Sequence, residues 1–378
     1  MLLVLSLGWA TLQGGRFLLS PLLPRITETF SLSSGGAGLA LTAFGLAYAV
    51  SQYPSGTYSD ALSRATLILP AFAVLLTGFV LVGVAGGVAV FVLGILLLGV
   101  GKGLYASPSR ALLGDLYTGS RGRALGIYAA GTDAGGLLAA GLAAVVLATT
   151  VWQAAFVPVV VLLALVTVLF VLWNEEQYRV EHTPLEPGDT LRRVLATRAQ
   201  RERLVAFAFF YFAVGGLTNF YPLFLVESAG FSETIASVAF ALIFAVGLFV
   251  KPAAGELSDR FPRLLVSIAG LLAGALGFAV MILGSASLAV VAVGTVLAAV
   301  GYKTQFPIAD AVVMEAAPDE NVGGDLGAAR GVFLGTNALG PGFVGVVADV
   351  AGFDVAFWAL AASLLVAALV LARQYRRQ

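Results

Sequence analysis

Four ionisable residues stand in the middle of long apolar runs: Arg16, Lys102, Asp133 and Lys303. In a hydrocarbon environment each charged side chain costs at least about 2.5–3.5 kcal/mol on insertion scales, so its presence indicates a function or a buried partner. Three cations against one carboxylate make a shared interior positive, unless a lysine loses its proton. Such an interior attracts anions and repels cations. These residues predict a binding site for a small organic or inorganic anion.

Each of the four residues also has a structural interpretation. Lys102 and Asp133 can pair with each other, and Arg16 can extend its guanidinium towards a membrane surface. Lys303 has Asp310 two turns along the same helix face as an alternative partner. If all three cations were neutralised, the interior would suit a lipophilic or drug-like solute. The aromatic side chains that would then line it are Tyr105, Phe220, Tyr221 and Phe306.

Asp133 is the predicted proton carrier, because it is a lone carboxylate whose protonation responds to desolvation and to neighbouring cations. Its counterpart in the second half of the chain is Asn337, which cannot titrate. Any proton coupling is therefore expected in the first half only. An anion exchanger needs no such proton, and proton-coupled efflux of lipophilic compounds is the alternative function.

Several uncharged polar or aromatic side chains near the same depth are candidate hydrogen-bonding partners for a substrate. They are Gln13, Tyr105, Asn219, Gln305 and Asn337. Asn and Gln side chains within membrane helices serve equally as bonds between neighbouring helices. Arg110 and Lys251 lie towards the ends of their predicted helices, where pairing at a gate or an interfacial position is expected. Asp115 is expected to join a gate network.

The amino-acid composition indicates that these residues belong to a membrane protein. Of 378 residues, 59% are hydrophobic and 11% are charged, and the mean hydropathy is +0.96, whereas an ordinary soluble domain carries about 25% charge. Apolar runs of roughly 20 residues, long enough to cross a bilayer as a helix, recur along the chain. The absence of cysteine excludes disulfides and thiolate chemistry. The fold class predicted is an all-α, multi-pass membrane protein.

Twelve membrane-spanning helices are expected, six on each side of a polar stretch. Their predicted ranges are 2–24, 36–55, 65–84, 88–113, 123–147, 151–173, 204–226, 234–254, 264–284, 287–314, 326–348 and 353–372. The polar stretch, 174–203, holds six arginines and six acidic residues. The chain thus divides into a bundle at 1–173, a linker at 174–203 and a second bundle with a short tail at 204–378.

The distribution of basic residues predicts the orientation. If Met1 is cytoplasmic, the connections on that side carry Arg64, Arg121, Arg123, the linker arginines, Arg260, Arg263, Arg373, Arg376 and Arg377. The opposite connections carry only Arg25, together with Glu28, Glu227, Glu233, Asp349 and Asp354. Both termini and the linker are therefore predicted to be cytoplasmic. Compact loops and the preference for arginine over lysine indicate a prokaryotic plasma membrane.

The two halves share an ordered series of short motifs at offsets of 199 to 204 residues. The pairs are Gly14-Gly15 with Gly215-Gly216, Pro21 with Pro222, Phe30-Ser31 with Phe231-Ser232, Gly56-x-x-x-Asp60 with Gly255-x-x-x-Asp259, and Gly131-Thr132-Asp133-Ala134 with Gly335-Thr336-Asn337-Ala338. A nearly constant offset indicates parallel repeats related by an axis along the membrane normal. Lys102 and Lys303 occupy equivalent helices in this repeat.

This organisation resembles the major facilitator superfamily of secondary transporters. That family carries Gly-x-x-x-Asp and basic residues after its second helix, and two such segments occur here. They are GTYSDALSR, with Gly56, Asp60 and Arg64, and GELSDRFPR, with Gly255, Asp259, Arg260 and Arg263. The first copy departs from the family in having Leu62-Ser63 where a glycine and a second basic residue are usual. A short turn between helices favours the same residue types, but two copies at matching places favour a gate.

The resemblance implies alternating access around a midplane site, with the first, fourth, seventh and tenth helices lining the cavity. Lys102 and Lys303 would then flank one site together with Arg16. An arginine in the first helix resembles organophosphate and carboxylate transporters. The matching position in the seventh helix is Leu217, however, so a pair of arginines from these two helices cannot hold the substrate.

No enzyme motif, cofactor, metal cluster or nucleic-acid motif is evident in the sequence. The expected partners are a small-molecule substrate, the lipid bilayer and protons as a coupling ion, with the chain a monomer. A non-transporting sensor is the less favoured alternative.

Overall fold

The computed structural model describes residues 1–149, 151–176, 195, 197–314 and 322–377; the side chains of some helical residues, Asp60 and Asp310 among them, lie outside this description. The chain forms two compact units. The first unit is Met1–Ser31 with Ala43–Leu185, and the second is Leu32–Thr42 with Glu186–Gln378. The second unit therefore includes the first turns of a helix that continues in the first. Each unit is described on its own.

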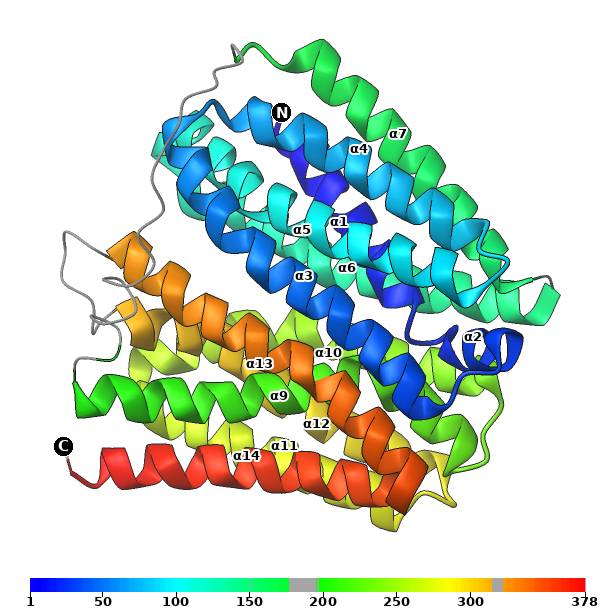
Figure 1. Cartoon of the computed structure of the whole chain (residues 1–378). Coiled ribbons are helices and arrows are strands. Elements are labelled where there is room, and N and C mark those ends of the chain that lie inside the picture. The colour runs from blue at the N-terminus through cyan, green and yellow to red at the C-terminus, as the bar shows by residue number, and fades with distance from the viewer. Residues whose placement is uncertain (150, 177–194, 196, 315–321, 378) are drawn as a thin grey trace. The chain divides into compact units, whose positions relative to one another are not determined.

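The first unit is built from antiparallel helices (Figure 1). They are α1 (Leu2–Leu18), α2 (Leu23–Phe30), α3 (Ser34–Ala61, in this unit from Ala43 onwards), α4 (Arg64–Gly83), α5 (Val88–Leu116), α6 (Arg121–Thr149) and α7 (Phe156–Trp173), with short 3₁₀ turns at Thr118–Ser120 and Trp152–Ala155. In the second unit the helices are α9 (Arg198–Glu227), α10 (Glu233–Arg260), α11 (Arg263–Leu283), α12 (Leu288–Met314), α13 (Val322–Ala351) and α14 (Phe353–Tyr375). Within the described residues, 11 helices are long and apolar enough to span a membrane, or up to 12 if α1 and α2 form one bent span.

The prediction of one continuous first helix over 2–24 was wrong. α1 ends at Leu18, α2 begins at Leu23, and their axes differ by 54°. Pro21 lies in the break and has no N–H with which to continue a helix. Pro24 lies in the first turn of α2, where its missing N–H is tolerated. The two prolines explain both the end of α1 and the restart at α2.

The start of the second bundle also differs from the prediction. α9 begins at Arg198 rather than at 204, so residues 198–203 of the predicted linker are helical. Thr197 and Gln200 form a capping box, in which each side chain bonds the other's backbone N–H. This cap satisfies donors that the helix start leaves unpaired. The rest of the predicted linker at 177–194, including His182, lies outside the described residues.

The first unit has two distinct ends. At one end the Leu2 N–H donates to the Tyr117 hydroxyl at 3.4 Å, and the Ala65 N–H donates to the Glu176 carboxylate at 2.8 Å. At the other end the Trp152 indole donates to Thr29 at 3.1 Å. The starts of α1 and α4 therefore meet the segments that follow α5 and α7, as antiparallel helices require.

In the second unit, too, contacts join the helices at both ends. Figure 1 shows α9, α13 and α14 running side by side, and the three helices contact one another. At one end Arg377 pairs with Glu202 at 2.8 Å, and Arg203 donates to the Val312 carbonyl at 3.1 Å. At the opposite end the Ser228 hydroxyl donates to Asp354.

The internal repeat predicted from the sequence is present in the packing. α1 packs extensively against α6 as α9 does against α13, and α4 against α5 as α11 does against α12. Glycine permits the first pair of contacts in both units. A methyl group added at Gly14 would lie 3.2 Å from the Gly135 carbonyl oxygen, and one added at Gly215 would overlap the Asn337 carbonyl oxygen. Close backbone approach at small residues is the usual way in which membrane helices associate.

We expect Gly215→Ala to destabilise the second unit by about 1–3 kcal/mol, because the backbone of α13 must move to admit the methyl group. The measurement is the melting temperature of the purified protein in detergent. Gly141→Ala in α6 is the matched control, since no atom of the described residues lies within 4 Å of its added methyl group. A Gly215→Ala variant as stable as the control would contradict the close contact.

Candidate functional site

Lys102 of α5 lies inside the first unit with 8% of its surface exposed. Its ammonium nitrogen is 4.4 Å from the centre of the Tyr48 ring, 5.8 Å from that of Phe44 and 5.9 Å from that of Trp9. Aromatic faces attract cations but carry no net charge. We call these three rings the aromatic cage. Within the described part of the chain, Lys102 has no hydrogen bond or ion pair.

The possible ion pair between Lys102 and Asp133 is therefore not formed. Asp133 lies in α6 with 1% of its surface exposed. The carboxylate is deep in the unit, as the sequence predicted, but it does not neutralise Lys102.

Arg110 shares the Trp9 ring with Lys102. Its guanidinium carbon is 5.2 Å from the centre of Trp9 and 5.7 Å from that of Tyr128. The two rings are stacked with centres 5.1 Å apart. Gate pairing or an interfacial position was expected for Arg110, and among the described residues no carboxylate contacts it. Sequence reasoning missed both Arg110 and Trp9 as site residues, although Trp9 and Arg16 share one face of α1 at a spacing of seven residues.

Hydrogen bonds fix the aromatic rings of this region. The Trp9 indole donates to Thr132 of α6 at 2.9 Å, and the hydroxyls of Tyr128 and Ser109 are 2.7 Å apart. Buried indole and phenol groups need such partners. The rings that face Lys102 and Arg110 are therefore held by both α5 and α6.

Arg16 completes the group of cations in this unit. It is half-buried in the last turn of α1, 4.5 Å above the ring of Phe17. The positive charges of Arg16 and Arg110 both lie near enough to Lys102 to act on its ammonium group. We call Arg16, Lys102 and Arg110 the cationic cluster.

The second unit repeats the contact between a lysine and aromatic rings. Lys303 of α12 is 1% exposed, and its nitrogen lies 4.7 Å from the centre of Phe244 and 4.4 Å from that of Tyr302. Phe44 and Phe244 correspond in the internal repeat, as do Lys102 and Lys303. Equivalent lysines therefore meet equivalent phenylalanines in the two units.

Four of the predicted substrate-binding side chains bond protein groups instead. Each uses its polar group within the unit to which it belongs: Tyr105 donates to Leu5 O at 2.8 Å, Asn219 to Gly215 O at 2.7 Å, Gln305 to Ser267 O at 2.9 Å and Asn337 to Tyr211 O at 2.9 Å. The Gln305 carbonyl also accepts the Ser267 hydroxyl at 2.5 Å. Three of these bonds join different helices, so these side chains serve as the bonds between helices that were the alternative to substrate binding.

The first gate motif forms contacts at one end of the first unit. Arg64 pairs with Asp115 at 3.1 Å and donates to Ser59 at 2.8 Å. A methyl group at Gly56 would lie 3.9 Å from the Ser107 hydroxyl, which is ordinary contact. The side chain of Asp60 lies outside the described residues. Asp115 therefore joins the motif's arginine, as expected of a gate network.

The second gate motif forms two pairs within its own segment of the chain. Arg260 pairs with Glu256, and Arg263 lies 4.0 Å from Asp259. No described atom lies within 4 Å of a methyl group added at Gly255, so this glycine makes no close helix contact in the described part of the chain. Exposed pairs of this kind contribute little to stability.

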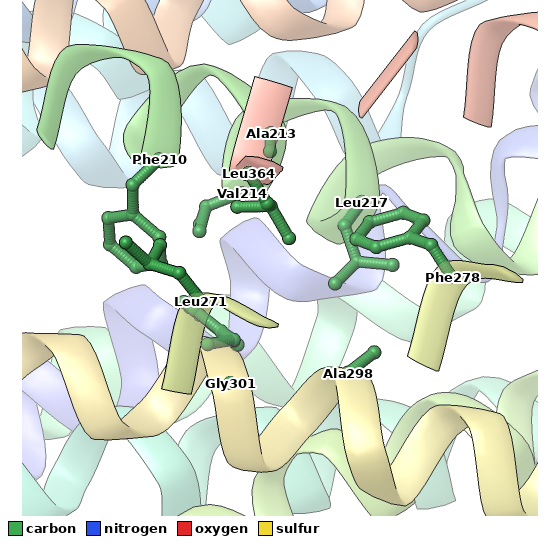
Figure 2. A pocket seen from close by; sticks show the side chains of 10 residues that line it. Phe210, Ala213, Val214, Leu217, Leu271, Phe278, Ala298, Gly301 and Leu364 are labelled. Atoms are coloured by element: carbon green, nitrogen blue, oxygen red, sulfur yellow. The ribbon is translucent and has the colours of Figure 1, made fainter. Parts of the chain in front are cut away.

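A small apolar cavity lies inside the second unit (Figure 2). Its volume is about 10 Å³, and its lining is Phe210, Ala213, Val214, Leu217, Leu271, Phe278, Ala298, Gly301, Tyr302 and Leu364. A cavity of this size holds at most about one water molecule. Leu217 occupies the position equivalent to Arg16, and this cavity is not a site for an anion.

Comparison with known proteins identifies the family. The family model of the Major Facilitator Superfamily matches residues 5–281 and 203–378. A hexuronate transporter of Bacillus subtilis (strain 168) is 24% identical over 255 residues, which are 65% of this chain and 60% of that protein. The fosmidomycin resistance protein of Escherichia coli (strain K12) is 26% identical over 341 residues, which are 86% of this chain and 80% of that protein.

Solved structures share the fold at low sequence identity. A bacterial homologue of the human lysosomal transporter Spinster, in an inward-facing and occupied conformation, superposes with a TM-score of 0.81 at 20% identity. The match covers 99% of this chain and 96% of that one. The predicted fold class is thereby confirmed. The chain belongs to the Major Facilitator Superfamily, whose members are transporters and not enzymes, and it is a multi-pass protein of a prokaryotic plasma membrane.

Proposed function

We propose that this protein is a secondary transporter that moves a small anion across the membrane by alternating access. The observation that carries the proposal is Lys102, a buried lysine surrounded by three aromatic rings, with no ion pair among the described residues. Two further cations, Arg16 and Arg110, act on it electrostatically.

Lys102 has no carboxylate as a counter-charge among the described residues. A lysine inside a membrane protein is costly unless something stabilises it. The aromatic cage lowers this cost through the electrostatic attraction of its ring faces, but it leaves the positive charge uncancelled. An anionic substrate would supply the opposite charge, and it would do so only while bound.

Residue roles follow from this proposal. Arg16 and Lys102 in the first unit bind the anion, and Lys303 is the equivalent candidate in the second unit. Asp133 exchanges the coupling proton, and Arg64 with Asp115 belongs to a gate. The relative named a hexuronate transporter supports an anionic substrate, because hexuronate carries a carboxylate.

A second candidate function is proton-coupled export of lipophilic compounds. The fosmidomycin resistance protein, which matches 86% of this chain, supports export of a drug, but its name supports neither a lipophilic substrate nor proton coupling. Aromatic rings also accompany the second unit's lysines, with Lys251 lying 5.5 Å from the centre of Phe306. Lipophilic cations would then be the preferred ligands, and the lysines would be neutralised within the protein.

We expect small carboxylates, sulfate or nitrate to raise the melting temperature of the detergent-purified protein. A ligand at a hundredfold excess over its Kd stabilises the folded state by about 2.7 kcal/mol. Lys102→Met should abolish this stabilisation, and Lys102→Arg should retain part of it, because only arginine keeps the charge. Arg373→Met is the matched control, since it removes an exposed cation from the last turn of α14. Stabilisation by lipophilic cations alone would instead support export.

Proton coupling is tested separately in reconstituted vesicles. We expect Asp133→Asn to abolish anion uptake driven by a pH gradient and to preserve anion exchange at equal pH on both sides. The reason is that asparagine keeps the shape of the side chain but cannot release a proton. Equal loss of both activities would rule out a coupling role for Asp133.

A further inference from the structure

Gln13 of α1 is a buried polar side chain whose amide makes no hydrogen bond within the described part of the chain. It is 5% exposed, and its carbonyl oxygen is fully buried without a donor. Buried side-chain amides in folded proteins almost always have a partner. Gln305, the other buried glutamine considered as a substrate residue, has both ends of its amide bonded to Ser267. The unbonded amide of Gln13 therefore differs from that of Gln305 and points to a partner outside the described residues.

Gln13 lies between two members of the site on the same face of α1. Trp9, Gln13 and Arg16 follow a spacing of four and three residues, which places their side chains along one stripe of the helix. Trp9 contacts both Lys102 and Arg110, and the charge of Arg16 acts on Lys102. The unbonded amide thus belongs to the same stripe as the groups that contact the cationic cluster.

The other faces of α1 are already filled by packing. A methyl group at Gly14 would lie 3.2 Å from the backbone oxygen of Gly135, and one at Gly15 would collide with the ring of Phe79. These glycines face α6 and α4. Gln13 projects from a different face, so the helix contacts of its neighbours do not satisfy its amide.

We infer that the transported anion is a hydroxylated organic acid whose hydroxyl group hydrogen-bonds the Gln13 amide while its acid group meets the cationic cluster. This inference rests on the proposed function and specifies its substrate class. A hydroxyl group both donates and accepts, so it can satisfy either end of an amide. Nitrate and simple alkanoates carry no donor for the Gln13 carbonyl oxygen.

The experiment compares anions that differ by hydroxyl groups, with the full-length purified protein. The probes are lactate against propionate, gluconate against hexanoate, and nitrate, and the readout is the Kd from thermal stabilisation. We expect the wild type to bind each hydroxylated acid at least about tenfold more tightly than its partner, the factor that about 1.4 kcal/mol represents. In Gln13→Leu the two members of each pair should bind within about twofold of each other, with propionate and hexanoate unchanged.

A matched control and a second variant keep the test decisive. Gln374→Leu removes another buried amide with no partner among the described residues, 4% exposed in α14 of the second unit, and should leave the ratio unchanged. Gln13→Met preserves the side-chain volume if leucine impairs folding. A wild type without hydroxyl preference, or a Gln13 variant that keeps the preference, overturns the inference alone. Failure of every anion to bind overturns the proposed function as well.

Discussion

The close contact between helix backbones determines what else fits inside each unit. In hydrocarbon the polar backbone must form its hydrogen bonds within helices. Because lipid tails are as apolar as the side chains, these helices associate through packing rather than through the hydrophobic effect. Glycine at Gly14 and Gly215 lets α1 meet α6 and lets α9 meet α13. This contact places Trp9 of α1 next to Thr132 of α6, to which it donates a hydrogen bond. The position of the ring above Lys102 and Arg110 depends on the same helix pair.

Both units place aromatic rings beside a buried lysine. Each surrounds the ammonium group with aromatic rings, and the phenylalanines concerned, Phe44 and Phe244, are equivalent in the internal repeat. The surroundings nevertheless differ. The first unit adds Arg16, Arg110 and an unbonded glutamine, whereas the second places Leu217 beside an apolar cavity. The two units therefore share a fold but differ in the groups that accompany the buried lysine, and the cationic cluster lies in the first unit.

Much of the fold could be predicted from sequence because apolar length and repeated motifs depend on local composition. The helix count, the repeat and the family followed from these features. The break between α1 and α2 was missed because the run remains apolar across Pro21 and Pro24, and hydropathy does not register a missing backbone donor. The site was only partly predictable. Lys102 and Asp133 stand out as buried charges, but their failure to pair depends on side-chain directions. Likewise, the aromatic rings near Arg110 come from two other helices, α1 and α6.

The break after Leu18 gives Arg16 a setting that a continuous helix would have denied it. Arg16 lies in the last turn of α1, where the aligned peptide dipoles leave partial negative charge on the terminal carbonyl groups. A cation there is stabilised by its own helix as well as by any ligand. The carbonyl end of α1 thus provides a fixed negative potential without a charged side chain. Transporters that end a helix within the membrane use the same electrostatic principle to hold ions.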